Sequence, residues 1–503
     1  MLLSLLLMVA PARKARARTG SPKVRPAAGA RAVLLPSANN PLVAIRLYFD
    51  VGADDDPKGK EGLAALTATM LGEGGTKERT YAEVLDALYP MAAHIREYGD
   101  KDSMVFEGTV HRDNLAAFAD LLAAQILEPR FSPDDFSRNK QDALDYLTKT
   151  LRGNDDENLG KQAFASVMYG GHPYGHPTTG TVSGLGAVTL DDVKRFYADH
   201  FTRDRLIVGL AGGYSEDFAR AFVARFEALP AKGRPRAAVP AAPAVKGPEV
   251  VIVEKEARAN AISLGHPLKL TRADDDFYAL TVARSYLGEH RTFNGMLMIN
   301  MRQKRGLNYG DYAYVENFIQ EGWSTFPLPN VARRQQHFEI WIRPVAPHNT
   351  GFALRQALYE TDKLIREGIP AAGFEATRTF LLNYSNLWAQ DVSRRLGYAI
   401  DAQVYGRDLI EELKTRLPKM KKADVDRAVR KHLSVKNLSI AIVSEKGAEL
   451  RDTLLSGKPT PIVYDTKDTP PEVVKEDKVI EKFPLGLKAA RVKVLPVEKL
   501  FEQ

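Results

Sequence analysis

The sequence predicts an α+β fold of two duplicated lobes, each with helices packed on a mainly antiparallel sheet. Three observations lead to this prediction: mixed strand and helix patterns, a proline-rich segment near mid-chain, and a sequence echo between the two halves. Few βαβ repeats are evident, which favours α+β over a doubly wound architecture. A chain of 503 residues is also too long for one ordinary hydrophobic core.

The periodicity of apolar residues gives the individual elements. Alternating or continuous apolar runs predict strands, and these lie at 42–49, 104–110, 206–210, 338–343 and 438–443. Apolar stripes at helical spacing predict helices, and these lie at 62–71, 114–127, 352–367 and 371–388. The strands at 206–210 and 438–443 each follow a helical pattern and a histidine, so the same sequence of elements occurs twice.

The two halves also correspond residue by residue. Adding 232 to Phe106, Asp192 and His200 gives Phe338, Asp424 and His432. A shared offset at separated places predicts an internal duplication.

A linker and a tail divide the chain. Residues 230–248 contain five prolines, and proline fixes φ and lacks an amide donor, so an extended linker is predicted there. The linker separates an N-terminal lobe at 32–229 from a C-terminal lobe at 249–445. Residues 446–503 are charged and proline-rich, which predicts an extended tail that wraps the body or links it to something else.

The net charge of +7 comes from a leader at residues 1–31, which carries seven bases and no acid. The remaining chain is nearly neutral, so its bulk charge gives no support for nucleic-acid binding. The apolar run 2–10 is far shorter than the roughly 20 residues of a membrane span and fits an export signal. No base precedes this run, so a start further upstream and a simple terminal tail stay open. We expect a periplasmic or otherwise exported protein with no membrane span.

Several chemistries are excluded by what the sequence lacks. There are no cysteines, which excludes disulfides, thiolate zinc sites and cysteine nucleophiles. The nucleophile elbow, phosphate-loop and dinucleotide-binding glycine motifs are also absent.

The segment 62–71, Gly-Leu-Ala-Ala-Leu-Thr-Ala-Thr-Met-Leu, resembles the zinc helix of the insulinase/pitrilysin-type metallopeptidases, a family that includes the mitochondrial processing peptidases. That helix normally contains His-x-x-Glu-His. The stretch 172–177, His-Pro-Tyr-Gly-His-Pro, also resembles the family, and the likeness spans roughly 32–445. The resemblance implies a half-clamshell of two duplicated α+β lobes.

The chain departs from the family at the metal. Two histidines four apart on a helix hold zinc, and the glutamate between them activates water. Ala65, Ala68 and Thr69 occupy these places, so we predict no metal ligand and no catalytic residue in this chain. Glu157 falls near the family's third ligand, but as a lone carboxylate it is better explained as a solvated acid, and whether it retains any metal stays open. His172 and His176 have helical spacing, but the adjacent prolines argue against a metal pair.

A second motif lies in the C-terminal half. Residues 302–309, Arg-Gln-Lys-Arg-Gly-Leu-Asn-Tyr, resemble a family stretch found in the zinc-free chain of two-subunit members. The resemblance implies that Arg305 and Tyr309 bind substrate. Gly306 would end a helix, and a guanidinium and a phenol held there could donate hydrogen bonds to a peptide carbonyl. A surface arginine and a core tyrosine are the structural alternative.

We therefore expect a non-catalytic, substrate-binding subunit that is inactive alone. Its partners would be a homologous subunit that carries the zinc and a peptide or unfolded polypeptide substrate. The alternative is a non-enzymatic peptide-binding or scaffold protein derived from the same fold, and a monomeric enzyme with a rebuilt metal site is a third possibility.

Overall fold

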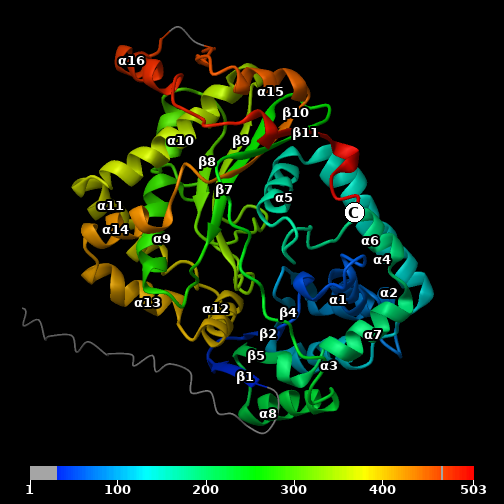
Figure 1. Ribbon diagram of the computed structural model, residues 1–503. Coiled ribbons are helices and arrows are strands. Elements are labelled where there is room, and N and C mark those ends of the chain that lie inside the picture. The colour runs from blue at the N-terminus through cyan, green and yellow to red at the C-terminus, as the bar shows by residue number, and fades with distance from the viewer. Residues whose placement is uncertain (1–30, 466–467) are drawn as a thin grey trace, which may run out of the picture.

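The computed structural model describes residues 31–465 and 468–503, and these form two lobes side by side (Figure 1). Nearly all of the predicted leader lies outside the described residues. Each lobe contains one sheet with helices packed against it, and most strand pairs are antiparallel. The predicted two-lobed α+β fold is confirmed. No helix in the described part of the chain is both long and apolar enough to cross a membrane.

The N-terminal lobe is built on a five-stranded sheet of order β1-β5-β2-β4-β3, in which only β1 and β5 run parallel. Its strands are β1 (Arg31–Pro36), β2 (Leu42–Phe49), β3 (Arg96–Gly99), β4 (Met104–His111) and β5 (Leu206–Gly212). Its α-helices are α1 (Leu63–Glu73), α2 (Tyr81–Leu88), α3 (Leu115–Leu127), α4 (Pro133–Asp145), α5 (Asp156–Met168), α6 (Val182–Ala187), α7 (Leu190–His200) and α8 (Glu216–Arg225). A π-helix at Tyr146–Asn154 continues α4.

The C-terminal lobe is built on a six-stranded sheet of order β11-β6-β10-β7-β9-β8. Its strands are β6 (Glu249–Glu254), β7 (Asn260–Leu268), β8 (Asp311–Tyr314), β9 (Gln336–Val345), β10 (Ser439–Ser444) and β11 (Val492–Pro496). Its α-helices are α9 (Asp275–Gly288), α10 (Thr350–Glu367), α11 (Ala371–Tyr384), α12 (Val392–Tyr405), α13 (Leu409–Arg416), α14 (Lys422–His432), α15 (Gly447–Leu455) and α16 (Pro471–Ile480). A π-helix at Met298–Gln303 precedes β8.

The two sheets have the same strand order once β11 is set aside. β4 and β9, which carry Phe106 and Phe338, occupy the same position in their sheets. The offset is 218 between the starts of β2 and β7, whereas it is 232 for Phe106 and Phe338. The longer connection between β8 and β9, at 315–335, more than accounts for this change, because only 100–103 join β3 to β4.

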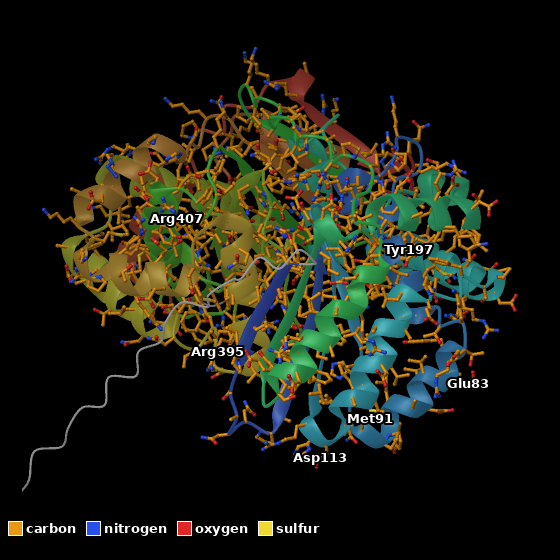
Figure 2. The ribbon with its side chains drawn as sticks, turned by 90° about the horizontal axis from the view of Figure 1, so that it is seen from below. Glu83, Met91, Asp113, Tyr197, Arg395 and Arg407 are labelled. Carbon is orange, nitrogen blue, oxygen red and sulfur yellow. The ribbon has the colours of Figure 1, made fainter. Side chains whose placement is uncertain are left out.

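The lobes exchange one helix each across their interface. α5 of the N-terminal lobe packs on β7 and β10 of the C-terminal sheet, and α12 of the C-terminal lobe packs on β2 and β5 of the N-terminal sheet. Figure 1 shows α5 between the two sheets and α12 beside β2. Seen from below, Arg395 and Arg407 mark the C-terminal side, and Glu83 and Tyr197 mark the other lobe (Figure 2). One hydrophobic core therefore contains residues from both lobes, such as Phe164 and Val443.

The segment 230–248 has no helix or strand and is held to both lobes by polar contacts. The tail was predicted to be extended, but it contains regular elements. It forms α15 and α16, adds β11 parallel to β6, and then crosses to the N-terminal lobe (Figure 1). There the backbone carbonyl of Leu500 accepts a 2.9 Å hydrogen bond from Arg152 Nε. The side chains of Leu500 and Phe501 are buried in the core that contains the N-terminal sheet.

Candidate functional site

Helix α1 begins in a tightly enclosed turn. Gly62 has a φ of 108°, and a Cβ there would lie 2.4 Å from the carbonyl oxygen of Thr179, so only glycine fits. The Asp56 carboxylate accepts hydrogen bonds from the N–H groups of Gly62 and Ala64, each at 2.7 Å, which satisfies free donors at the helix start. Burial raises the pKa of Asp56 to about 8. Helix α1 is thus held firmly in place, although it lacks the zinc-binding residues of the family that it resembles.

The three positions of the expected zinc motif lie on this helix. Ala68 is buried, and Ala65 and Thr69 are partly exposed. The Thr69 hydroxyl donates a 2.9 Å hydrogen bond to Glu97 Oε1 on β3. Two methyl groups and one hydroxyl cannot replace two imidazoles and a carboxylate, so these residues do not fit zinc. In the described part of the chain, no three histidine, cysteine or carboxylate side chains are arranged to hold a metal ion.

A pocket of about 630 Å³ lies beside these positions. Its acidic lining residues are Glu73, Glu97 and Asp142. Burial raises the pKa of Glu97 to about 7, although Thr69 donates a hydrogen bond to it. A pocket with acidic residues is therefore present beside positions that offer no metal ligand.

Glu157 does not line this pocket. It lies at the start of α5, and its Oε1 accepts a 2.8 Å hydrogen bond from Arg343 Nε on β9, which makes it part of an ion pair between the lobes. Asp142 on α4, by contrast, lines the pocket together with Ala65 and Thr69. The sequence did not indicate the ion pair of Glu157, because its partner Arg343 lies 186 residues further along the chain.

A second cavity of about 500 Å³ lies between the lobes. Gly99, Tyr146, Thr178 and Thr179 line both this interlobe cavity and the pocket at α1, so the two spaces adjoin. The C-terminal lobe contributes residues of 317–322 and of β9, and the N-terminal lobe contributes α5 and the turn after β3. The arrangement is a chamber with one wall from each lobe.

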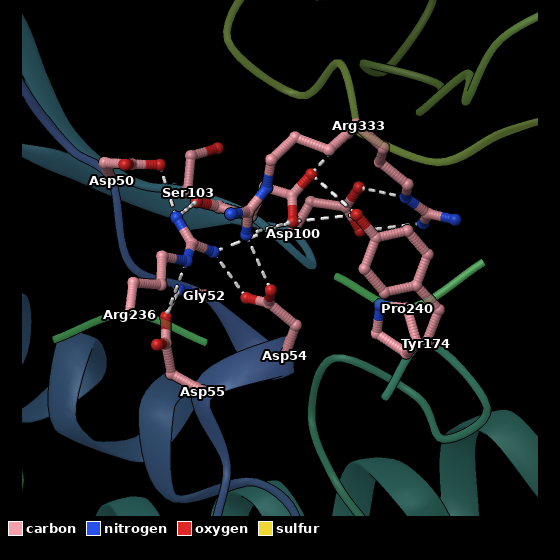
Figure 3. A network of polar contacts seen from close by, with 12 residues as sticks. Asp50, Gly52, Asp54, Asp55, Asp100, Ser103, Tyr174, Arg236, Pro240 and Arg333 are labelled. Carbon is pink, nitrogen blue, oxygen red and sulfur yellow. Dashed lines mark hydrogen bonds and ion pairs between the residues drawn. The ribbon is translucent and has the colours of Figure 1, made fainter. Parts of the chain in front are cut away.

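A buried ionic network holds the walls together (Figure 3). Arg333, in the connection between β8 and β9, binds the Asp100 carboxylate through two hydrogen bonds of 2.5 and 2.8 Å. Arg236 of the linker forms ion pairs with Asp50 and Asp54. Tyr174 donates to the Asp102 carboxylate at 2.7 Å. These contacts fix both the linker and the long β8–β9 connection against the N-terminal lobe.

The structure separates the two predicted substrate-binding residues. The Arg305 side chain is fully buried, and its guanidinium donates to Asp477 and Glu476 of α16, each at 2.8 Å, and to the carbonyl oxygen of Asn300 at 2.9 Å. Tyr309, by contrast, is 76% exposed. Gly306 has a φ of 64°, as expected for a glycine that ends a helical turn.

The arginine that lies beside Tyr309 is Arg302. Its guanidinium carbon is 5.5 Å from the centroid of the Tyr309 ring and 5.2 Å from that of the exposed Phe293 ring. Arg305 was predicted because residues 302–309 resemble a family stretch, and Arg302 was not considered. The π-helix that ends at Gln303 brings Arg302 to Tyr309, and this irregular turn has no clear sequence signal.

His172 and His176 do not form a pair of ligands. Nε2 of His172 lies 2.9 Å from the carbonyl oxygen of Pro240, and Nδ1 of His176 lies 2.8 Å from that of Pro177. Burial lowers the pKa of both imidazoles, that of His176 to about 3. These histidines fasten the linker and a turn rather than a metal.

Two family models match the chain in succession. The model described as Insulinase (Peptidase family M16) matches residues 31–182, and the model described as Peptidase M16 inactive domain matches residues 187–381. The chain belongs to the insulinase family. The two matches meet at α6, before the last strand of the N-terminal lobe, and together they cover both walls of the chamber.

Family members with similar sequences carry different descriptions. An uncharacterized zinc protease of Mycobacterium leprae is 24% identical over 292 residues, which are 57% of this chain and 64% of the relative. The chain thus matches less than two thirds of that relative's length. A non-peptidase homolog of Helicobacter pylori is 22% identical over 420 residues, which are 81% of this chain and 90% of the relative.

Solved structures share the fold. A peptidase M16 inactive domain from Pseudomonas fluorescens superposes with a TM-score of 0.72 at 22% identity, covering 83% of this chain and 96% of that one. A protease from Helicobacter pylori superposes with a TM-score of 0.71 at 16% identity, covering 83% and 97%. These likenesses show the fold, the family models show the membership, and α1 of this chain lacks the zinc motif.

Proposed function

We propose that this chain is the non-catalytic, substrate-binding subunit of a heteromeric zinc-dependent peptidase. The observation that carries the proposal is the contrast on α1: Ala65, Ala68 and Thr69 replace the metal ligands, yet the pocket beside them persists and adjoins the interlobe cavity. A protein that had lost all contact with peptides would have no use for this space. The description of a relative as a non-peptidase homolog supports the same proposal.

The partner in this proposal is a homologous subunit with an intact His-x-x-Glu-His helix, and its zinc performs the hydrolysis. One more distant relative, 19% identical over 179 residues, is named as the beta subunit of a mitochondrial processing peptidase of Dictyostelium discoideum, so assembly from subunits has support within the family. The substrate is a peptide or unfolded segment that enters the chamber. Export of the chain, proposed from its leader, would place this activity outside the cytoplasm.

Tyr309 is available to such a peptide because its ring is exposed. Arg305 could reach a peptide only after α16 moves away, since its side chain is buried and its hydrogen bonds go to Asp477, Glu476 and Asn300. Arg302 lies beside Tyr309 without such a cover. A guanidinium and a phenol side by side can both donate hydrogen bonds to a peptide carbonyl.

The deciding experiment combines metal analysis with reconstitution. The purified single chain should contain no stoichiometric zinc and cleave no peptide, whereas co-expression with a zinc-bearing homologue should yield a complex that does both. Zinc-dependent cleavage by the pure single chain would refute the proposal. If no such homologue forms a complex but peptides still bind, the non-enzymatic peptide-binding alternative is favoured instead.

The roles of the tyrosine and the two arginines are tested in the reconstituted complex. Tyr309→Phe and Arg302→Ala should lower peptide turnover without dissociating the subunits, because each removes a hydrogen-bond donor from the exposed Arg302–Tyr309 pair. Arg305→Ala should lower turnover only if α16 is released during the reaction. Full activity of all three variants would show that this motif does not contact substrate.

A further inference from the structure

Lys161 occupies an unusual position in the interlobe cavity. It lies on α5, one turn from Glu157, and its side chain lines the cavity. Its Nζ is 2.9 Å from the centroid of the Trp341 ring, which lies on β9 of the opposite lobe and is 2% exposed. The ammonium group thus rests on an aromatic face between the lobes.

No described residue accepts a hydrogen bond from the Lys161 ammonium group or forms an ion pair with it. The two nearby glutamates have other partners: Glu157 is paired with Arg343 at 2.8 Å, and Glu339 Oε2 is 3.4 Å from His337 Nε2. An ammonium has three donors and an aromatic face satisfies them poorly, so at least two donors are free to bind an oxygen.

The cavity wall near Lys161 has one unused polar atom as well. Glu339, which lines the cavity, has a buried Oε1 without a hydrogen-bond partner among the described residues. Most buried polar groups in folded proteins are satisfied. An unpaired carboxylate oxygen at the cavity wall can accept a hydrogen bond from an N–H group of a ligand.

The burial of the Lys161 ammonium group is unfavourable, and the pKa of this lysine reflects it. Burial lowers the pKa of Lys161 to about 8, because the charged form is poorly solvated there. A methionine or leucine would pack on Trp341 without this cost. The retention of a charge at this point is explained if the charge serves to bind an anion.

We propose that Lys161 is the anchor for a peptide carboxylate in the interlobe cavity, with the Trp341 ring beneath it. The inference rests on the proposed peptide-binding function and specifies which peptides bind. A carboxylate is the anionic group that unmodified peptides carry, either at the C-terminus or on an aspartate or glutamate side chain. Its oxygens would accept the free donors of the ammonium and form a charge-assisted ion pair away from bulk water.

The test measures binding of three fluorescein-labelled decapeptides of otherwise identical sequence by fluorescence anisotropy. The first has a free C-terminus, the second a C-terminal amide, and the third a C-terminal amide with one internal glutamate. The full chain should bind the free acid at least about tenfold more tightly than the amide, which corresponds to about 1.4 kcal/mol. If the glutamate peptide binds as tightly as the free acid, the anchor accepts a side-chain carboxylate as well.

Three variants locate the effect. Lys161→Met should abolish the preference for carboxylates, Lys161→Arg should keep most of it, and Lys194→Met, at an exposed position on α7, should leave it unchanged. Equal binding of acid and amide peptides by the wild type, or an unchanged preference in Lys161→Met, would overturn the anchor while leaving peptide binding intact. Failure of every peptide to bind would overturn the proposed function, and the anchor with it.

Discussion

The two helices that cross between the lobes are placed alike but bury their charges differently. Under α12, Arg46 of β2 is 2% exposed and donates to Glu107, to Asn330 at 2.6 Å, to Ser393 at 2.9 Å and to Tyr98 at 3.0 Å. At α5, Lys161 lines a cavity, lies over the Trp341 ring and has no hydrogen bond or ion pair among the described residues. One interface is therefore closed around an arginine with several hydrogen bonds, and the other has a lysine without a hydrogen bond or ion pair at the edge of a cavity.

The difference has a physical cause in packing. Gly397 of α12 lies so close to the sheet that a Cβ would be 2.4 Å from a guanidinium nitrogen of Arg46, which leaves no space for a ligand. On the C-terminal sheet, α5 approaches closely at Gly160, where a Cβ would lie 3.8 Å from side-chain atoms of Ala261 and Val443. The cavity lies toward β9 and the β8–β9 connection. Duplicated elements thus supply a rigid joint on one side and a binding wall on the other.

The strongest effect should come from the closed interface. Arg46→Met should lower the free energy of unfolding by about 3–5 kcal/mol, because it leaves the Glu107 carboxylate without its buried partner. Urea denaturation at neutral pH measures the loss. The exposed pair of Arg220 with Asp217 gives the control, and Arg220→Met should cost at most about 1 kcal/mol. Equal losses of unfolding free energy in the two variants would mean that the burial of Arg46 under α12 does not increase its contribution to stability.

The β8–β9 connection provides the second comparison. Arg333→Ala should cost about 3 kcal/mol of unfolding free energy, since Asp100 is 3% exposed and loses two hydrogen bonds. The same variant should loosen 315–335, which hydrogen exchange of its amides would detect. A loss below about 1 kcal/mol with unchanged exchange would show that the connection is held by other contacts.

A smaller effect concerns pH at the pocket beside α1. Because burial raises the pKa of Glu97 to about 7, ionisation of this group opposes folding increasingly as the pH rises from its unfolded pKa of about 4.5 to 7. Glu97→Gln should therefore be more stable than the wild type by about 1 kcal/mol at pH 7.5 and by much less at pH 4.5. Urea denaturation at both pH values measures this. A difference that does not change with pH would contradict the assigned environment.

The smallest effect should come from the open interface. Lys161→Met should change the free energy of unfolding by no more than about 1 kcal/mol, with stabilisation the expected direction at pH 7, because no ion pair is lost and a poorly solvated charge is removed. Thermal denaturation of Lys161→Met and Arg46→Met under the same conditions compares the two changes in stability. A loss as large as that of Arg46→Met would mean that Lys161 is structural and not an anchor.

The local elements were largely predictable. The alternating pattern at 42–49 gave β2 with the bounds that the structure shows, and the apolar stripe at 114–127 gave α3 to within a residue. The tail was the main failure. Its prolines suggested an extended chain, yet Pro471 stands in the first turn of α16, where proline's fixed φ suits a helix and its missing N–H costs nothing.

The candidate site was predictable only in part. The loss of ligands at Ala65, Ala68 and Thr69 is visible in the sequence, because a spacing of four on a helix is a local property. The partner of Arg305 is not visible, since Asp477 lies 172 residues further along the chain. Arg302 was not considered from the sequence, because nothing in the pattern indicates the π-helix, whose wider turn changes which side chains share a face.

By itself, the sequence determined that the protein has two related lobes and that its own α1 offers no zinc ligands. Hydrophobic period and the spacing of ligands on one helix are local, so neither depends on how the lobes meet. Only the tertiary structure decided that Glu157 and Arg305 form ion pairs. It also decided that Lys161 forms none among the described residues. Such pairings join segments far apart in the chain, and their geometry is set by how α5 and the tail pack across both lobes.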